Sequence, residues 1–167
     1  MGGKNKLPMS ELKLLFEKAG CKGVRTYIAS GNVVFDAPPK AAEKLASVVT
    51  AAIEKQFGLR VPVVIRNTEE MSRISRDNPF VKMDPAWLYV MFLADEPDQK
   101  AVAELDAQRS PGDRYEVRGR DIFMTLTTGA ADTKLTNAYF DTKLKTVSTS
   151  RNWRTVLKLV EMCAEEE

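Results

Sequence analysis

The order of helix-like and strand-like segments limits this chain to a small set of mixed folds. In the N-terminal half, apolar residues at helical spacing alternate with short β-branched and aromatic runs that are bounded by Gly, Pro and Asn. The predicted elements are, in order, a helix over 10–19, strands over 24–29 and 33–37, a helix over 38–58 and a strand over 59–66. Pro62 inside the last run favours an edge position or a bulge for that strand.

The C-terminal half has a similar order. The run WLYVMFLA at 87–94 is almost continuously apolar, which predicts a strand that is buried on both faces. The elements predicted around it are a short helix from Thr68 to Asn78-Pro79, a helix over 98–108, a hairpin of strands over 114–119 and 121–126, a helix over 132–144 and a last helix over 150–164.

Both halves fit most of the β-α-β-β-α-β unit, so we predict an α+β fold of two ferredoxin-like halves. Each half would have an antiparallel sheet with helices on one face. We place the first half, with a connecting helix, at 1–80 and the second half, with the C-terminal helix, at 81–167. The two halves could also pack as one compact unit.

The first half lacks a leading strand in this pattern. The chain opens with MGGKNKLPMS, a loop of the kind that connects a strand to a helix, although no strand precedes it. In the ferredoxin-like order the first strand is central, and without it two strands lose backbone partners, at about 1–3 kcal/mol per buried unpaired group. We therefore expect the natural protein to start upstream of Met1. The alternative is that the two neighbouring strands pair directly with each other.

Three motifs, GGKNKLPM, TYIASGNVVF and LTNAYFDTKLK followed by TSRNWRTVLKL, occur in the order found in a known bacterial family. In these motifs the sequence resembles the proteins of domain of unknown function 1697. Members of that family usually carry a hydrophobic strand ahead of the Gly-Gly-Lys-Asn loop, which this sequence lacks. The resemblance implies a duplicated ferredoxin-like fold, and it implies no reaction.

Composition excludes several kinds of chemistry. The chain of 167 residues has no histidine, which rules out Ser-His-Asp and Cys-His nucleophiles and imidazole zinc sites. Its net charge of +2 is low for a nucleic-acid-binding protein. We expect Cys21 and Cys163 to be free thiols in the cytoplasm, and we predict no metal, no cofactor and no membrane span.

The first candidate site joins two glycine-containing loops. Strand tracing places Ser30 and Asn32 at the same end of the sheet as Lys4 and Asn5, beside a helix N-terminus that favours an anion. The alternative, which we favour, is that these residues serve the turns alone, because Gly31 and Asn32 are what a tight hairpin needs.

The second candidate site is the segment TSRNWRT with the preceding helix. Ser150 could cap the last helix there, and the fork of Arg151 could hold phosphate or carboxylate, assisted by Asn152. Thr136 and Asn137 would face the same space. The alternative is that Arg151 and Asn152 merely cap and solvate the helix end while Trp153 belongs to the core.

These patterns leave three hypotheses on function. The first is binding of an anionic or phosphorylated ligand, either a nucleotide or a nucleic acid, at the polar loops. The second is an enzyme without histidine that acts on a phosphorylated substrate. The third is a protein-interaction module that pairs through an open sheet edge, which would allow an oligomer.

Overall fold

The computed structural model describes residues 7–27 and 31–164. The chain divides into two compact units, one formed by Met1–Ile65 with Glu161–Glu167 and the other by Arg66–Val160. We call them unit 1 and unit 2. The boundary between them lies at Ile65 and Arg66, so the helix that starts at Thr68, which we expected in the first half, is part of unit 2.

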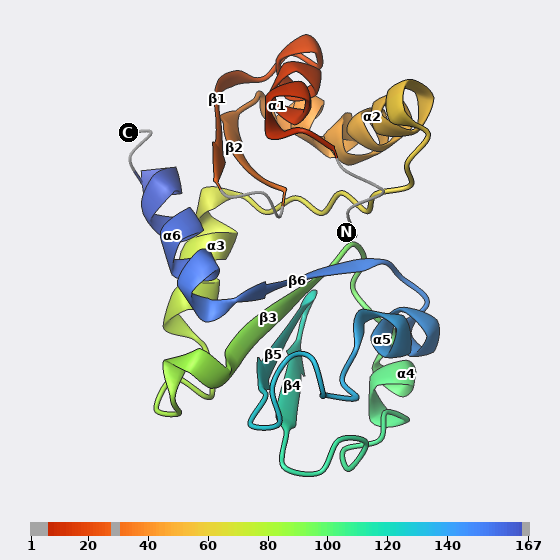
Figure 1. Cartoon of the computed structure of the whole chain (residues 1–167), viewed down its shortest axis with the longest axis vertical. Coiled ribbons are helices and arrows are strands. Elements are labelled where there is room, and N and C mark those ends of the chain that lie inside the picture. The colour runs from red at the N-terminus through yellow and green to blue at the C-terminus, as the bar shows by residue number, and fades with distance from the viewer. Residues whose placement is uncertain (1–6, 28–30, 165–167) are drawn as a thin grey trace. The chain divides into compact units, whose positions relative to one another are not determined.

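Unit 1 packs two helices on a β-hairpin (Figure 1). Its elements are α1 (Met9–Lys18), β1 (Lys22–Tyr27), β2 (Asn32–Asp36) and α2 (Pro39–Phe57). The strands are antiparallel, with Thr26 opposite Val33. The core is made of buried side chains from both helices and β1, among them Leu15, Phe16, Val49 and Ile53. Because Gly58 adopts a left-handed conformation (φ 67°), it ends α2 at the position where glycine is favoured.

The strand that we predicted over 59–66 is absent, which corrects the sequence interpretation. Leu59, Val61, Val63 and Ile65 pack against the unit 1 core with the expected period of two. However, among the described residues β2 pairs with β1 alone, so the segment joins no ladder and direct pairing with β2 does not occur. Alternating burial alone therefore does not identify a strand, because a sheet is defined by its inter-strand hydrogen bonds.

Unit 2 is built on a four-stranded sheet with the order β4-β5-β3-β6, in which every neighbouring pair is antiparallel. Its elements are α3 (Thr68–Arg76), the 3₁₀ turn η1 (Pro85–Trp87), β3 (Leu88–Leu93), α4 (Gln99–Ala103), β4 (Arg114–Arg118), β5 (Asp121–Thr125), α5 (Asn137–Leu144), β6 (Ser148–Asn152) and most of α6 (Trp153–Ala164). The chain is thus an α+β protein with two antiparallel sheets.

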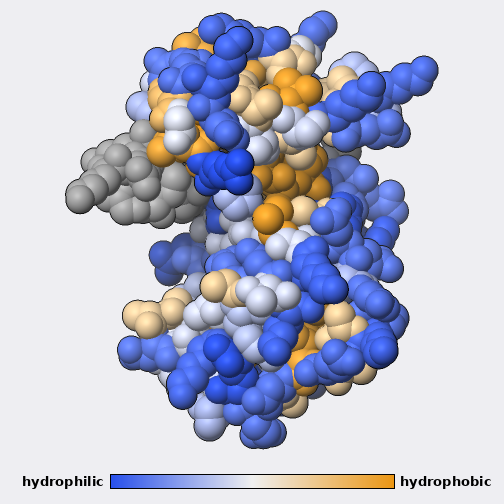
Figure 2. Space-filling view, turned by 90° about the vertical axis from the view of Figure 1, so that its right-hand side faces the viewer, coloured by the Kyte–Doolittle hydropathy of each residue, from blue (hydrophilic) through white to orange (hydrophobic). Residues whose placement is uncertain are grey.

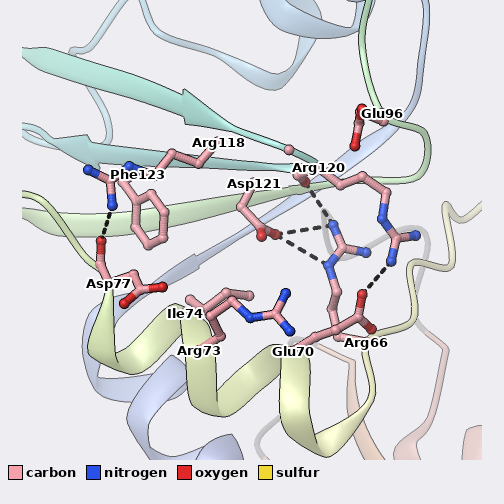
Figure 3. A pocket seen from close by; sticks show the side chains of 11 residues that line it. Arg66, Glu70, Arg73, Ile74, Asp77, Glu96, Arg118, Arg120, Asp121 and Phe123 are labelled. Atoms are coloured by element: carbon pink, nitrogen blue, oxygen red, sulfur yellow. Dashed lines mark hydrogen bonds and ion pairs between the residues drawn. The ribbon is translucent and has the colours of Figure 1, made fainter.

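Helices cover both faces of the unit 2 sheet, whereas we expected them on one. On one face, Met91 and Leu93 of β3 pack with Phe140 of α5 in a buried cluster. On the other face, Ile74 of α3 lies against Phe123 of β5 (Figure 3). Because successive side chains of a strand point to opposite faces, this double cover explains why β3 is buried almost throughout.

The end of the chain also differs from the prediction. We placed a helix over 150–164, but Ser150 and Arg151 belong to β6, where Arg151 is opposite Val90. The helix begins at Trp153 because the side chain of Asn152 accepts a hydrogen bond from the Thr155 N–H at 2.9 Å, a helix-capping contact.

The loop between β5 and α5 is longer than predicted because a buried carboxylate fixes it. Asp113 is 5 % exposed and accepts hydrogen bonds from the hydroxyls of Ser110 (2.8 Å), Thr128 (2.6 Å) and Thr133 (2.7 Å) and from the Thr128 N–H (3.0 Å). Thr136 then caps α5, so that helix starts at Asn137 and not at 132. No helix in the described part of the chain is long and apolar enough to cross a membrane.

Candidate functional site

Of the four residues of the first predicted site, only Asn32 is among the residues that the structure describes. Lys4, Asn5 and Ser30 lie outside the described residues. Asn32 is 4 % exposed, and its side-chain amide donates to the Tyr27 carbonyl at 3.0 Å. This bond closes the hairpin between β1 and β2, so the side chain of Asn32 has the turn-forming role that we weighed against ligand binding.

The second predicted set is divided between the two faces of the unit 2 sheet. Asn137 donates to the hydroxyl of Ser148 at 2.8 Å, and Ser148 is opposite Leu93, whose side chain belongs to the α5 face. Arg151 is three residues along β6 from Ser148 and therefore points to the other face. Thr136 is occupied as a cap, accepting from the Tyr139 N–H at 3.2 Å. The expected common space is not formed by these residues.

The side chain of Arg151 makes hydrogen bonds to neighbouring residues of its own strand. Its guanidinium donates to the Thr149 hydroxyl at 2.5 Å and to the Ser150 carbonyl at 2.8 Å, and burial lowers its pKa. Asn152 is exposed and caps α6, and Trp153 is 5 % exposed in the core. These contacts agree with the capping and core alternative that we considered for this segment.

A different group of charged side chains gathers around a pocket of about 320 Å³ in unit 2 (Figure 3). Its walls come from α3, from the turn between β4 and β5 and from the loop after β3, and its apolar floor is Ile74 with Phe123. The charged residues that line it are Arg66, Glu70, Arg73, Asp77, Glu96, Arg118, Arg120 and Asp121. We call it the arginine pocket.

An ion pair between a buried arginine and a partly buried carboxylate lies at the base of the arginine pocket. Arg66, with a side chain that is 4 % exposed, contacts the Asp121 carboxylate through Nη2 at 3.2 Å and through Nε at 3.3 Å. Arg66 also donates to the backbone carbonyls of Leu93 (2.9 Å) and Arg120 (2.7 Å). Burial raises the pKa of Asp121 and lowers that of Arg66, and their mutual attraction opposes both shifts.

A second ion pair joins the first turn of α3 to the hairpin. Arg120 donates to Glu70 at 2.6 Å, and Glu70 also closes a capping box with Asn67, whose N–H lies 2.9 Å from the Glu70 carboxylate. Burial acts to raise the pKa of Glu70, but the hydrogen bonds from Asn67 and Arg120 outweigh it and lower that pKa. Glu70 is therefore firmly ionised near neutral pH.

The other two arginines are more open. Arg73 contacts only Glu69, one turn away on α3, at 3.5 Å among the described residues, and its side chain is 57 % exposed. Arg118 pairs with Glu116 and donates to the Asp77 carbonyl at 2.6 Å. Each guanidinium carries five N–H donors. In the described part of the chain, Arg73, Arg118 and Arg120 thus use only a minority of theirs.

Sequence reasoning missed the arginine pocket, although two local signals point to it. Arg66, Glu70 and Arg73 follow one another at a spacing that places charges on one side of a helix. Arg118 and Arg120 flank Gly119 at the turn of the predicted hairpin. Neither signal indicates that the two segments meet, because that contact depends on tertiary structure.

Unit 1 holds a second, less polar hollow of about 540 Å³ between α1 and α2. Leu15 and Ala19 of α1 line it together with Val48 and Ala52 of α2, and Val48 is 48 % exposed. In the upper part of Figure 2, hydrophobic residues of this unit lie at the surface. Among the described residues, no group of His, Cys, Asp and Glu has an arrangement that could hold a metal ion.

Comparison with known proteins identifies the family. The family model described as protein of unknown function DUF1697 matches residues 1–123. The chain belongs to this family. The matched segment contains every residue that lines the arginine pocket of this DUF1697 protein. No curated protein matches the chain.

A solved structure supports the fold of this DUF1697 protein. It is that of the conserved bacterial protein SP0830 from Streptococcus pneumoniae, which is 22 % identical, with a TM-score of 0.69. The match covers 98 % of this chain and 92 % of the other. At this identity the likeness shows a shared fold alone. The expectation of an uncharacterised bacterial family is thus confirmed.

Proposed function

We propose that this protein binds a small molecule through an anionic group, and that the arginine pocket holds that group. The observation that carries the proposal is the convergence of Arg73, Arg118 and Arg120 on one pocket with most of their N–H donors unused among the described residues. Phosphate and carboxylate oxygens match the planar fork of a guanidinium.

The setting of these arginines favours binding over mere solvation. The Arg66–Asp121 pair and the Arg120–Glu70 pair hold the hairpin and α3 at fixed positions around the pocket. A ligand would therefore meet an Arg120 guanidinium that is already partly ordered, which lowers the entropy lost on binding. The pocket volume of about 320 Å³ lies at the lower end of small-molecule sites and favours a compact ligand over a nucleic-acid strand.

Ligand-induced stabilisation tests this proposal. Both tryptophans of the chain, Trp87 and Trp153, belong to unit 2, so tryptophan fluorescence reports the unfolding of the unit that contains the pocket. At ten times its dissociation constant, a ligand of the native state adds about 1.4 kcal/mol, which raises the melting temperature of a domain of this size by roughly 6 °C. The probes are inorganic phosphate, pyrophosphate and propyl phosphate, with sodium chloride at equal ionic strength as the reference.

The variants Arg73→Gln and Arg120→Gln should each weaken binding at least about tenfold, the effect of losing a charged hydrogen bond of roughly 1.5 kcal/mol. Arg154→Gln is the matched control, because Arg154 is an exposed arginine of the same unit and does not line the pocket. A titration that does not saturate, or that is equally strong in all three variants, contradicts the proposal.

A second candidate is an enzyme without histidine that acts on a phosphorylated substrate. Asp121 favours it, because this partly buried carboxyl lines the arginine pocket and has a raised pKa, as general acids often do. Phosphorus NMR on propyl phosphate and pyrophosphate with the protein and with Asp121→Asn tests this candidate. Turnover that is lost in the variant supports it, and an absence of turnover contradicts it for these substrates.

We also infer a ferredoxin-like topology for unit 2 and a cytoplasmic location. The strand order β4-β5-β3-β6 with antiparallel pairs throughout supports the topology. An experimental structure in which β6 does not pair with β3 would contradict it. Neither Cys21 nor Cys163 forms a disulfide, which agrees with a reducing compartment. Cell fractionation tests the location, and recovery outside the cytoplasm would contradict it.

A further inference from the structure

The lining of the arginine pocket carries as many negative as positive charges. Four arginines and four carboxylates line it, so their formal charges cancel. A doubly charged phosphate alone would leave the occupied pocket with a negative excess, and a partly buried excess charge is unfavourable. A ligand that brings its own positive group reduces that excess. The balance of charges thus favours a ligand with groups of both signs.

Glu96 is one of two lining carboxylates whose side chains could meet such a positive group. Glu70 and Asp121 are already paired with Arg120 and Arg66. Glu96 is exposed, and its side chain contacts no partner within the described residues. It lies against the hairpin turn, since its Oε1 would be 3.9 Å from a Cβ built on Gly119. Figure 3 shows Glu96 beside the turn, on the opposite side of the pocket from Arg73.

Asp77 is the other lining carboxylate whose side chain has no partner in the described part of the chain. It follows the last turn of α3, and its backbone carbonyl accepts from Arg118. Asp77 therefore lies at the end of α3 near Arg118, whereas Glu96 lies beside Arg120, as Figure 3 shows. The two carboxylates are on different walls, so substitutions can separate their roles.

We propose that the natural ligand is an aminoalkyl phosphate or a similarly zwitterionic phosphate monoester, with its phosphate on Arg73 and Arg120 and its ammonium group on Glu96. This inference rests on the proposed function of the arginine pocket and adds the chemical class of the ligand.

Two probes of nearly equal shape test the inference. They are 2-aminoethyl phosphate and propyl phosphate, which differ by an ammonium group in place of a methyl group. Isothermal titration calorimetry on the full chain at pH 7 and low salt should show that 2-aminoethyl phosphate binds about fivefold more tightly, the upper range for an exposed ion pair. Glu96→Gln should remove this preference without weakening the binding of propyl phosphate, because it takes a negative charge out of the pocket lining, whereas the control Asp77→Asn should keep the preference.

The outcomes separate the two proposals. If propyl phosphate binds at least as tightly as 2-aminoethyl phosphate, the zwitterionic ligand is refuted while the anion site stands. If the preference persists in Glu96→Gln, or disappears in Asp77→Asn, the role of Glu96 is refuted. If neither ester binds, the proposed function fails and the inference fails with it. Circular dichroism of both variants confirms that the comparison concerns folded protein.

Discussion

Asp113 offers the sharpest test of how unit 2 is held together. One oxygen of this buried carboxylate accepts three hydroxyl donors, from Ser110, Thr128 and Thr133, at 2.6–2.8 Å, and the other accepts the Thr128 N–H at 3.0 Å. Asp113→Asn keeps the shape but replaces one acceptor oxygen by an amide donor. Whichever way the amide is oriented, at least one native donor then faces another donor.

The expected cost follows from these contacts. A hydrogen bond to a charged group contributes about 1.5–3 kcal/mol, and the hydroxyls can rotate to recover part of the loss. We therefore expect Asp113→Asn to lower the unfolding free energy of unit 2 by about 3 kcal/mol. With a denaturant slope of about 2 kcal/mol per molar urea, the midpoint falls by about 1.5 M.

Urea unfolding followed by tryptophan fluorescence measures this cost, because both tryptophans lie in unit 2. Asp132→Asn is the matched control, since Asp132 is exposed in the same loop. We expect that variant to change the free energy of unfolding by less than about 0.5 kcal/mol. Equal midpoints for the two variants would refute the stabilising role of Asp113.

The pH dependence provides an independent check. Burial acts to raise the pKa of Asp113, but the bonds from Thr128, Thr133 and Ser110 outweigh it and lower that pKa. A carboxyl whose pKa is lower in the folded state stabilises the fold above its unfolded pKa, and this contribution is lost as the pH falls through the folded value. The difference between wild type and Asp113→Asn should therefore shrink in acid. A difference that grows in acid would contradict this reasoning.

Two further predictions use the same urea assay. Because burial raises the pKa of Asp121, ionisation of this carboxyl opposes folding, and its penalty is present above the folded pKa. Asp121→Asn should therefore cost less at neutral pH than Arg66→Met, which should cost about 3 kcal/mol because it leaves two backbone carbonyls and a partly buried carboxylate without their donor. Equal costs would contradict this asymmetry. Thr136→Ala removes the cap of α5 and should cost about 1 kcal/mol, and an unchanged midpoint would show that the cap is dispensable.

The elements with strong apolar patterns could be predicted from sequence. The run predicted as a strand over 87–94 is β3 (Leu88–Leu93), and the hairpin predicted around Gly119 is formed by β4 and β5. In these segments the local pattern and the tertiary environment favour the same structure. Gly119 has φ 58°, so the turn uses a conformation that glycine adopts without strain.

Prediction failed where tertiary contacts decide the structure. β6 has the sequence STSRN, without the alternation that marks a half-buried strand, and it forms because β3 offers an edge to pair with. The segment over 59–66 has the opposite character, since it alternates well but joins no ladder among the described residues. A segment thus becomes a strand where a neighbouring strand is available to pair with it, and the sequence pattern alone does not identify that neighbour.

The candidate site was missed for the same reason. Charged residues at helical spacing usually form a solvated face, and nothing in the local pattern of α3 identifies the hairpin as its neighbour. Glu70 and Arg120 are 50 positions apart in the chain. A pocket assembled across such a separation has no local sequence signature.

The hairpin holds α3 at both of its ends, and this explains why a pocket persists between them. At the N-terminal end, Arg120 pairs with Glu70 in the first turn, where the helix dipole also favours a negative side chain. At the C-terminal end, Arg118 donates to the Asp77 carbonyl, one of the acceptors that a helix leaves without an intrahelical partner. Because each contact uses only part of its guanidinium, the remaining N–H groups are oriented by the same bonds that fix the helix. The charged walls are therefore positioned by the fold itself, which is the preorganisation that tight binding of a small charged ligand requires.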